Sequence, residues 1–280
     1  MSAVAIKRNG VECYKLKKFN GVEKQNISTH GRIDNSAAPV VFLTFEENSG
    51  STTEDLSESG TDHDATVQGT WSTVYKAAGN SSITFGSTNK HVVHTDHADF
   101  DWAVTDKWTI STYTATDSSS WVGVYVKREP SGNHYTGPAI FLNNGYLEVY
   151  LVDTWGSEAC QLVPTGTSTR AFGAGVYQHI VVTYDGSTNA SGFTAWVNGV
   201  KQTVANGKLT VGAGGDSLDS NSHVVNSMNA MWGADTSTSP SGLQSGGADN
   251  CAAWKGVHLT DAQAAILYNS GTPIDVRRGL

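Results

Sequence analysis

The sequence lacks a long apolar run. No stretch approaches the ~20 apolar residues that a membrane-spanning helix needs, so we expect no membrane span. The first ten residues, MSAVAIKRNG, also lack the apolar core of a secretory signal. We therefore expect a protein that is made in the cytoplasm without a signal peptide and is not exported by the common secretory route.

Cysteine is scarce as well. The three cysteines, Cys13, Cys160 and Cys251, form no CxxC pair, which argues against a thiolate zinc site. Their odd number and wide spacing favour reduced, buried thiols, with a Cys160–Cys251 bridge as the alternative. The sequence also lacks a G-x-S-x-G elbow and an H-E-x-x-H motif, and its nine histidines are scattered, so common hydrolase sites are not indicated.

Charged residues make up only 16% of the chain, whereas glycine is abundant, with 30 residues. This balance favours many short turns over long helices. Residues Gln178 to Tyr184 and Phe193 to Val197 both alternate with a period of two, and Asn198-Gly199 supplies a tight reversal. Bulky side chains on both faces of these strands predict a central place between two layers.

One short helix is expected near the C-terminus. Thr260 is a typical N-cap, and Gln263 completes a capping box at the third helical position. Gly271 and Pro273 then end the helical pattern after Asn269. We interpret this helix as a packing element.

The run YQHIVVTYDG, with a strand ending in VNG after it, resembles the laminin-G-like jelly roll of the concanavalin A-like lectin/glucanase superfamily. Further stretches resemble motifs of that family in the same order: Val41 to Glu47, Ser82 to Gly86, His91 to Val93, Lys107 to Ser111 and Leu259 to Tyr268. The resemblance implies an all-β, two-sheet antiparallel jelly-roll sandwich with the one short C-terminal helix. We therefore predict a LamG-like domain over residues 39–280, preceded by an arm over residues 1–38.

Some members of the superfamily that this chain resembles are β-glucanases, and these carry an E-x-D-x-x-E strand. A retaining pair of carboxyl groups must lie about 5 Å apart on one face. This chain has no such strand, because Glu46-Glu47 and Glu54-Asp55 are adjacent residues in or beside loops. We therefore predict that the protein is not an enzyme.

The resemblance also implies a calcium ion, held in the family by a D-S-x-x-G-x-x-D loop and an aspartate before the final strand. The corresponding residues here are Asp55, Ser57, Gly60, Asp62, Asp64 and Asp249. Calcium takes several hard oxygen ligands, so Asp55, Asp62, Asp64 and Asp249 are the predicted metal ligands, with a solvated acidic loop as the alternative. A second acidic stretch, Ala98 to Asp106, offers carboxylates to a cation or simply adds solubility.

Two strands carry aromatic side chains opposite aliphatic ones. Valine and leucine of Trp121 to Lys127 and Tyr146 to Val152 must face the core between the sheets. The opposite faces then form an outer ladder of Trp121, Tyr125, Tyr146, Glu148 and Tyr150, with Trp155 in the loop that follows. Aromatic rings of this kind stack on sugars, form protein interfaces, or lie under the chain's own arm. A protein contact is favoured, with a polysaccharide ligand second.

Charge is divided unevenly along the chain. Residues 1–34 hold seven Lys or Arg and three Asp or Glu, so they carry +4 of the net −8 and the remainder carries −12. A basic arm on an acidic body predicts that the arm docks on an acidic partner, with a solvated tail as the alternative. The predicted anchoring residues are Lys7, Arg8, Lys15, Lys17 and Lys18. The acidic body argues against binding of nucleic acid.

These observations favour a non-enzymatic virion structural protein, such as a bacteriophage capsid decoration or tail-associated protein. Its jelly-roll body would bind host or environmental glycans, and its arm would bind other capsid or tail proteins, in a homo-oligomer. Virions leave the cell by lysis, which suits an extracellular type of fold without an export signal. The alternatives are a bacterial carbohydrate-binding module and a glycan hydrolase.

Overall fold

The computed structural model describes most of the chain. The described residues are 3–8, 11–16, 18–19, 22–23, 38–74, 76–85, 90–116, 121–129, 135–169, 176–234 and 246–277. The chain divides into two compact units, Met1–Arg32 and Ile33–Leu280. No helix in the described residues is long and apolar enough to cross a membrane.

The first unit consists, in its described residues, of two short antiparallel pairs. β1 (Ala3–Arg8) pairs with β2 (Val11–Leu16), with Ala3 opposite Leu16. β3 (Lys18–Phe19) pairs with β4 (Val22–Glu23). The predicted arm therefore contains strand structure of its own.

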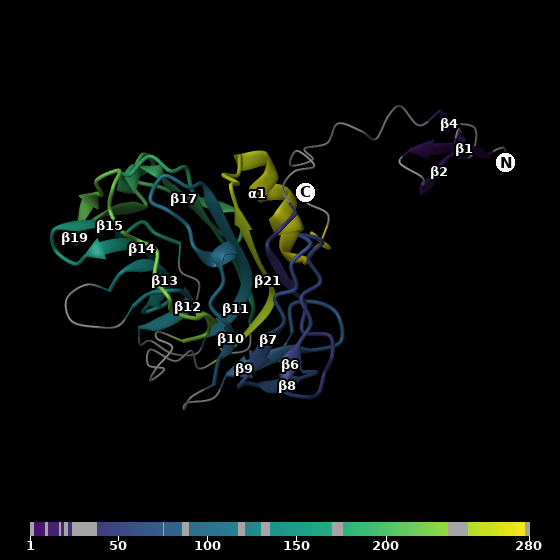
Figure 1. Cartoon of the computed structure of the whole chain (residues 1–280), viewed down its shortest axis with the longest axis horizontal. Coiled ribbons are helices and arrows are strands. Elements are labelled where there is room, and N and C mark those ends of the chain that lie inside the picture. The colour runs from purple at the N-terminus through teal and green to yellow at the C-terminus, as the bar shows by residue number, and fades with distance from the viewer. Residues whose placement is uncertain are drawn as a thin grey trace. The chain divides into compact units, whose positions relative to one another are not determined.

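The second unit contains two antiparallel sheets, seen as two layers in Figure 1, which confirms the predicted all-β class. In the described residues one sheet has nine strands and the other has eight. The nine-stranded sheet has the spatial order β19 (Leu209–Ser217), β15 (Glu158–Pro164), β14 (Tyr146–Thr154), β13 (Gly137–Asn143), β12 (Val122–Val126), β20 (Ala230–Trp232), β10 (Val92–His94), β7 (Ala65–Val67) and β6 (Thr52–Thr53). The eight-stranded sheet has the order β18 (Val200–Gln202), β17 (Phe193–Val197), β16 (Gln178–Tyr184), β11 (Trp108–Thr116), β21 (Gly246–Lys255), β9 (Ser82–Phe85) and β8 (Thr70–Ser72), with β5 (Val41–Leu43) also pairing with β21.

The predicted hairpins at residues 177–199 lie in the interior of the eight-stranded sheet. β16 is hydrogen-bonded to β11 on one side and to β17 on the other. Asn198 and Gly199 adopt φ values of 51° and 74° in the turn between β17 and β18, as a tight reversal requires. Ile180 faces the core between the sheets and Val181 faces the outer side, so both faces of β16 are buried, as predicted.

A single large apolar cluster fills the space between the two sheets. It takes buried side chains from both sheets and from the segment around the 3-10 helix η1 (Ala98–Phe100). Trp102 stacks on Trp108 of the eight-stranded sheet at 5.2 Å between ring centroids, and on Tyr125 of the nine-stranded sheet at 5.6 Å. Trp102 therefore joins the two layers directly.

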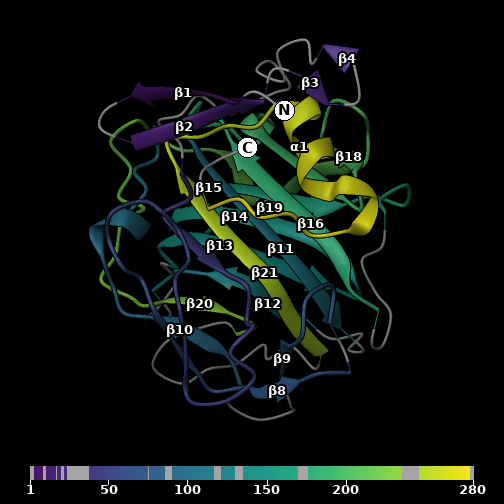
Figure 2. The same cartoon turned by 90° about the vertical axis from the view of Figure 1, so that its right-hand side faces the viewer.

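A second apolar cluster covers the outer side of the eight-stranded sheet. Helix α1 (Asp261–Tyr268) lies against this sheet, as Figure 2 shows, and buries Ala264 and Leu267 against it. The Thr260 side chain accepts from the Gln263 backbone N–H, and the Gln263 side chain accepts from the Thr260 backbone N–H. The predicted capping box and packing role of this helix are thus confirmed.

The interpretation of residues 121–127 needs one correction, at Tyr125. Val122 and Val124 face the core as predicted, but the pairing of β12 with β13 shifts register between Gly123 and Tyr125. Such a bulge adds one residue and reverses the alternation after it. Tyr125 therefore points into the core, where it is completely buried, and Val126 takes the outward position.

The two cysteines that the structure describes, Cys160 and Cys251, are free and buried, as the sequence predicted. Burial raises the pKa of the Cys160 thiol to about 12. Both thiols therefore stay protonated, which makes them poor nucleophiles and poor metal ligands.

The corrected place of Tyr125 predicts an unusual response to substitution. Its buried hydroxyl has no hydrogen-bond partner within the described residues, so Tyr125→Phe removes an unsatisfied polar group. We expect the free energy of unfolding to rise by about 1 kcal/mol in urea titrations.

Tyr184→Phe is the matched control for this experiment. The Tyr184 hydroxyl accepts a hydrogen bond from the Thr188 backbone N–H at 2.7 Å, so its removal should lower the free energy of unfolding by about 1 kcal/mol. If both variants lose the same free energy of unfolding, the Tyr125 hydroxyl must have a hydrogen-bond partner and the prediction is wrong.

Candidate functional site

An aromatic cluster lies on the outer side of the nine-stranded sheet, over β12 to β15. We call it the outer aromatic cluster, and its rings belong to Trp121, Tyr135, Phe141, Tyr150 and Trp155. β14 alternates as predicted: Leu147 and Leu151 face the core, whereas Glu148 and Tyr150 face outward. Trp121, Tyr150 and Trp155 of the predicted aromatic face thus lie in this cluster.

The rings of the outer aromatic cluster contact one another in sequence. Trp121 stacks on Phe141 at 3.7 Å between centroids, and Phe141 meets the face of Tyr150 edge-on at 5.6 Å. Trp155 stacks on Tyr150 at 5.7 Å and contacts Tyr135 edge-on at 6.1 Å. The edge-to-face contacts are a favoured geometry of aromatic pairs and the stacked contacts bury further apolar area, so the rings hold one another in place.

Arg128 lies among these rings. Its guanidinium carbon is 5.3 Å from the centroid of Trp121, and 4.8 Å from those of Tyr135 and Phe141. The side chain is buried, so these cation–π contacts form in a partly desolvated place where they are strongest. Arg128 thus adds a positive charge beneath the aromatic surface.

A chain of hydrogen bonds runs through the polar groups of the same face. The Tyr150 hydroxyl donates to Glu148 Oε2, Gln161 Nε2 donates to the Tyr150 oxygen at 3.1 Å, and Asn143 Nδ2 donates to Glu148 Oε1 at 3.0 Å. Gly214 N donates to Gln161 Oε1. Burial and the bond to Glu148 raise the pKa of Tyr150, so its hydroxyl keeps its proton. The network therefore fixes the ring of Tyr150 under Trp155.

Access to this face is uneven. Trp155 is 37% exposed, Trp121 and Tyr135 are half-buried, and Phe141 and Tyr150 are buried under them. Part of the predicted ladder is therefore covered by neighbouring side chains of the same sheet. Trp155 is the ring that a ligand can reach most easily.

Other predicted members have different places. Tyr146 is half-buried at the start of β14, opposite Asn143 of β13. Tyr135, Phe141, Arg128 and Gln161 were not predicted. Phe141 and Arg128 sit on outward positions that only the strand register reveals, since Phe141 lies opposite Glu148 and Arg128 follows the bulge in β12.

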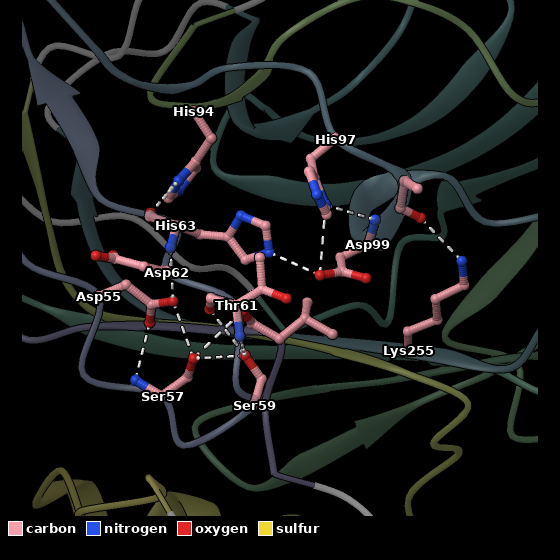
Figure 3. A network of polar contacts seen from close by, with 12 residues as sticks. Asp55, Ser57, Ser59, Thr61, Asp62, His63, His94, His97, Asp99 and Lys255 are labelled. Carbon is pink, nitrogen blue, oxygen red and sulfur yellow. Dashed lines mark hydrogen bonds and ion pairs between the residues drawn. The ribbon is translucent and has the colours of Figure 1, made fainter.

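The acidic loop that was predicted to bind calcium is organised around Asp55. Oxygen Oδ1 of Asp55 accepts from Phe42 N at 2.9 Å and Ser57 N at 2.8 Å, and Oδ2 accepts from Ser57 Oγ at 2.9 Å and His63 N at 3.1 Å. Figure 3 shows Asp55 and Ser57 in this loop. Asp64 Oδ1 accepts from Asp55 N at 2.8 Å. The carboxylate oxygens of Asp55 and Asp64 thus accept hydrogen bonds from backbone N–H groups.

Asp62 and Asp249 complete the predicted calcium set. Asp62 Oδ1 accepts from Asp64 N at 3.2 Å. Asp249 lies within β21, where its Oδ2 accepts from Ala77 N at 2.8 Å and Ala78 N at 3.2 Å. In the described residues these four aspartates do not form one compact group of metal ligands, so calcium stays a prediction.

The predicted anchoring residues lie in the first unit. Lys7 and Arg8 belong to β1, Lys15 to β2 and Lys18 to β3. Lys17 lies outside the described residues. Four of the five predicted cations are therefore carried on strands of the arm.

No protein-family model and no curated protein matches the sequence. Among solved structures, the binding domain of Paraclostridial Mosquitocidal Protein 1 is similar, with a TM-score of 0.59 and 14% identity over 83% of this chain and 52% of that chain. A botulinum neurotoxin type C structure, from work on cell entry that depends on interaction with two ganglioside molecules, has a TM-score of 0.54 and 12% identity over 84% and 51%. Trypanosoma rangeli sialidase, in complex with a difluoro-KDN, has a TM-score of 0.53 and 14% identity over 82% and 32%.

These likenesses show the fold. The chain spans about half, or a third, of the length of the structures that it matches. They support a β-sandwich of the type found in toxin binding domains and in a sialidase, consistent with the predicted sandwich. Activities and ligands of those larger proteins are not transferred by a similarity of this kind.

The environment of Asp249 predicts how stability changes with pH. Burial raises the pKa of Asp249 to about 7, although backbone N–H groups and Asn250 oppose the shift. Between pH 4 and 7 the folded state then holds a proton that the unfolded state releases, so the free energy of unfolding falls as pH rises, by about 4 kcal/mol at most from this group. Asp249→Asn removes that dependence.

We expect the melting temperature of Asp249→Asn, relative to the wild type, to rise by several degrees between pH 5 and pH 8. The comparison isolates Asp249, because buried histidines such as His94 and His179 contribute equally to both proteins. Calorimetry at a series of pH values measures the effect. A difference between the two proteins that stays constant with pH would contradict the raised pKa.

Proposed function

We propose that the sandwich is a non-enzymatic glycan-binding domain, and that its ligand stacks on Trp155 of the outer aromatic cluster. The observation that carries this proposal is the place of Trp155, a partly exposed ring that stacks on Tyr150 at 5.7 Å between centroids and 29° between ring planes. A ring that is fixed before binding loses little entropy when a sugar packs on it. The C–H groups on the apolar face of a pyranose can pack on the exposed face of such a ring.

The polar groups of the face support the same proposal. Glu148, Gln161 and Tyr150 satisfy one another's hydrogen bonds, so their role is to hold the aromatic rings. Hydroxyl contacts must then come from the rim, where the turn Gly156-Ser157 beside Trp155 is exposed. The neurotoxin structure associated with gangliosides and the sialidase complex add support from proteins of similar fold. Membership of the laminin-G-like family remains part of the proposal.

Trp155→Ala tests the ligand surface directly. We expect the affinity for the best ligand on a glycan array to fall roughly five- to tenfold, because the stacking partner of the sugar is removed. Isothermal titration with that ligand measures the change, and circular dichroism checks the fold.

Trp71→Ala is the matched control, since Trp71 is a half-buried tryptophan of β8 in the other sheet, with its Nε1 donating to Gly50 O. It should lose some stability and keep its affinity for the glycan. The proposal fails if the wild type binds no glycan on the array, or if the two variants lose affinity equally. Loss of association with a protein partner in Trp155→Ala alone would favour the protein interface instead.

A second role belongs to the arm, which we propose attaches the sandwich to a larger particle. The observation that favours it is that Met1–Arg32 forms a compact unit with its own strands, and that residues 1–34 carry +4 against −12 in the remainder. An acidic surface on the partner would complement this charge. The particle suggested by the sequence is a virion, in which the protein would be a capsid decoration or tail-associated subunit.

Deletion of residues 2–34 tests the attachment. We expect a folded, soluble sandwich that no longer sediments with the particle, since Ile33–Leu280 is a compact unit by itself. The measurement is particle occupancy after gradient centrifugation of a complemented deletion strain. Occupancy equal to that of the full chain would contradict the anchoring role.

A further inference from the structure

Two histidines and an aspartate come together where β7 and β10 lie side by side. His63 lies two residues before the first residue of β7, whereas His97 and Asp99 lie at the start of the 3-10 helix that follows β10. Figure 3 shows the three side chains pointing toward one another. In the part of the chain that the structure describes, this is the one group of three or more such side chains that is compact enough to hold a metal ion.

The distances in this group are close to those of a metal centre. His63 Nε2 lies 2.8 Å and His97 Nδ1 lies 3.4 Å from Asp99 Oδ2, and all three ligand atoms lie within 4.8 Å of one another. Tetrahedral zinc with bonds of about 2.0–2.1 Å places its ligand atoms about 3.3 Å apart. Zinc binding therefore requires Asp99 to move about 0.5 Å away from His63 and the exposed His97 ring to adjust its orientation.

His63 is held firmly in place. Its side chain is 5% exposed, and its ring packs against Phe100 at 4.8 Å between centroids. Its backbone N–H donates to Asp55 Oδ2 and its carbonyl accepts from His94 Nδ1 at 2.9 Å. His94 Nε2 in turn accepts from Trp232 Nε1, which can only donate, so the tautomer of His94 is fixed and both of its nitrogens are used. His94 is therefore a positioning residue.

The other two ligands face solvent. The side chain of His97 is 45% exposed and that of Asp99 is 32% exposed, so an ion can enter and a water molecule can take a fourth position. Three competing contacts must yield or be tolerated. His63 Nε2 and Asp99 Oδ2 share a hydrogen bond at 2.8 Å, Asp99 N donates to His97 Nδ1 at 3.2 Å, and Lys255 brings a positive charge close by donating to Ala98 O at 2.9 Å. The ion would take the place of the first contact, the second is a long bond, and the third is directed at a carbonyl.

The donor set distinguishes between metals. Two imidazole nitrogens and one carboxylate suit zinc and its neighbours in the first transition row, whereas calcium takes six to eight oxygens. The adjacent acidic loop does not supply those oxygens through Asp55, whose carboxylate accepts from backbone N–H groups and from Ser57. We infer that His63, His97 and Asp99 form a binding site for one zinc ion, with its fourth position open to solvent.

Titration of the full-length chain with zinc tests this inference. The protein is stripped with a chelator, freed of any polyhistidine tag, and titrated with Zn²⁺ against a competing chromophoric indicator at pH 7.5. We expect one tight equivalent and a rise in melting temperature with Zn²⁺. Addition of Ca²⁺ in place of Zn²⁺ should leave this site empty.

Variants assign the binding to these residues. His97→Ala, at an exposed position, should weaken zinc binding at least roughly tenfold, as should Asp99→Asn. His223→Ala, an exposed histidine elsewhere in the nine-stranded sheet's loops, is the control and should bind zinc as the wild type does. Absence of a tight equivalent in the wild type overturns the inference, and so does an equal loss in His97→Ala and His223→Ala. Because the first result concerns the unmodified protein, it holds whether or not a variant folds.

Discussion

Burial of apolar side chains between two sheets sets the position of every group on the surface of this protein. The stack of Trp108, Trp102 and Tyr125 crosses the space between the layers, and aliphatic side chains of both sheets fill the rest. Because side chains alternate along a strand, each residue that is drawn into this core fixes its neighbour on the outer side. Leu147 and Leu151 in the core thus place Glu148 and Tyr150 outside, and with them the surface on which Trp155 rests.

The sequence was sufficient to predict the structural elements whose pattern is local. The alternation of β14 and β16, the Asn198-Gly199 reversal and the Thr260 capping box all follow from residues a few positions apart, and all were found as predicted. The bulge in β12 could not be predicted this way, because the glycine-containing run Val122–Val126 keeps its apparent alternation while its partner strand shifts by one residue. One extra residue was enough to exchange the faces of Tyr125 and Val126.

The candidate sites were harder to predict, because their members meet across strands. Phe141, Arg128 and Gln161 join the outer aromatic cluster through the register of β13 to β15, which no single stretch of sequence contains. The acidic loop illustrates a second difficulty. A carboxylate that accepts from backbone N–H groups and one that binds a cation can have the same spacing in the sequence, and Asp55 proves to be surrounded by donors.

The order in which strands are synthesised has a consequence for how this chain folds. β21 (Gly246–Lys255) is among the last strands to be made, yet it lies inside the eight-stranded sheet and pairs with β5, β9 and β11. Until β21 has been made, β11 lacks its partner on one side and β5 lacks the strand with which it pairs. Contacts between such distant segments slow folding and expose aggregation-prone edges in the meantime. The sandwich can therefore close only once β21 is available, so a chain truncated before Gly246 yields an open sheet and not a smaller stable domain.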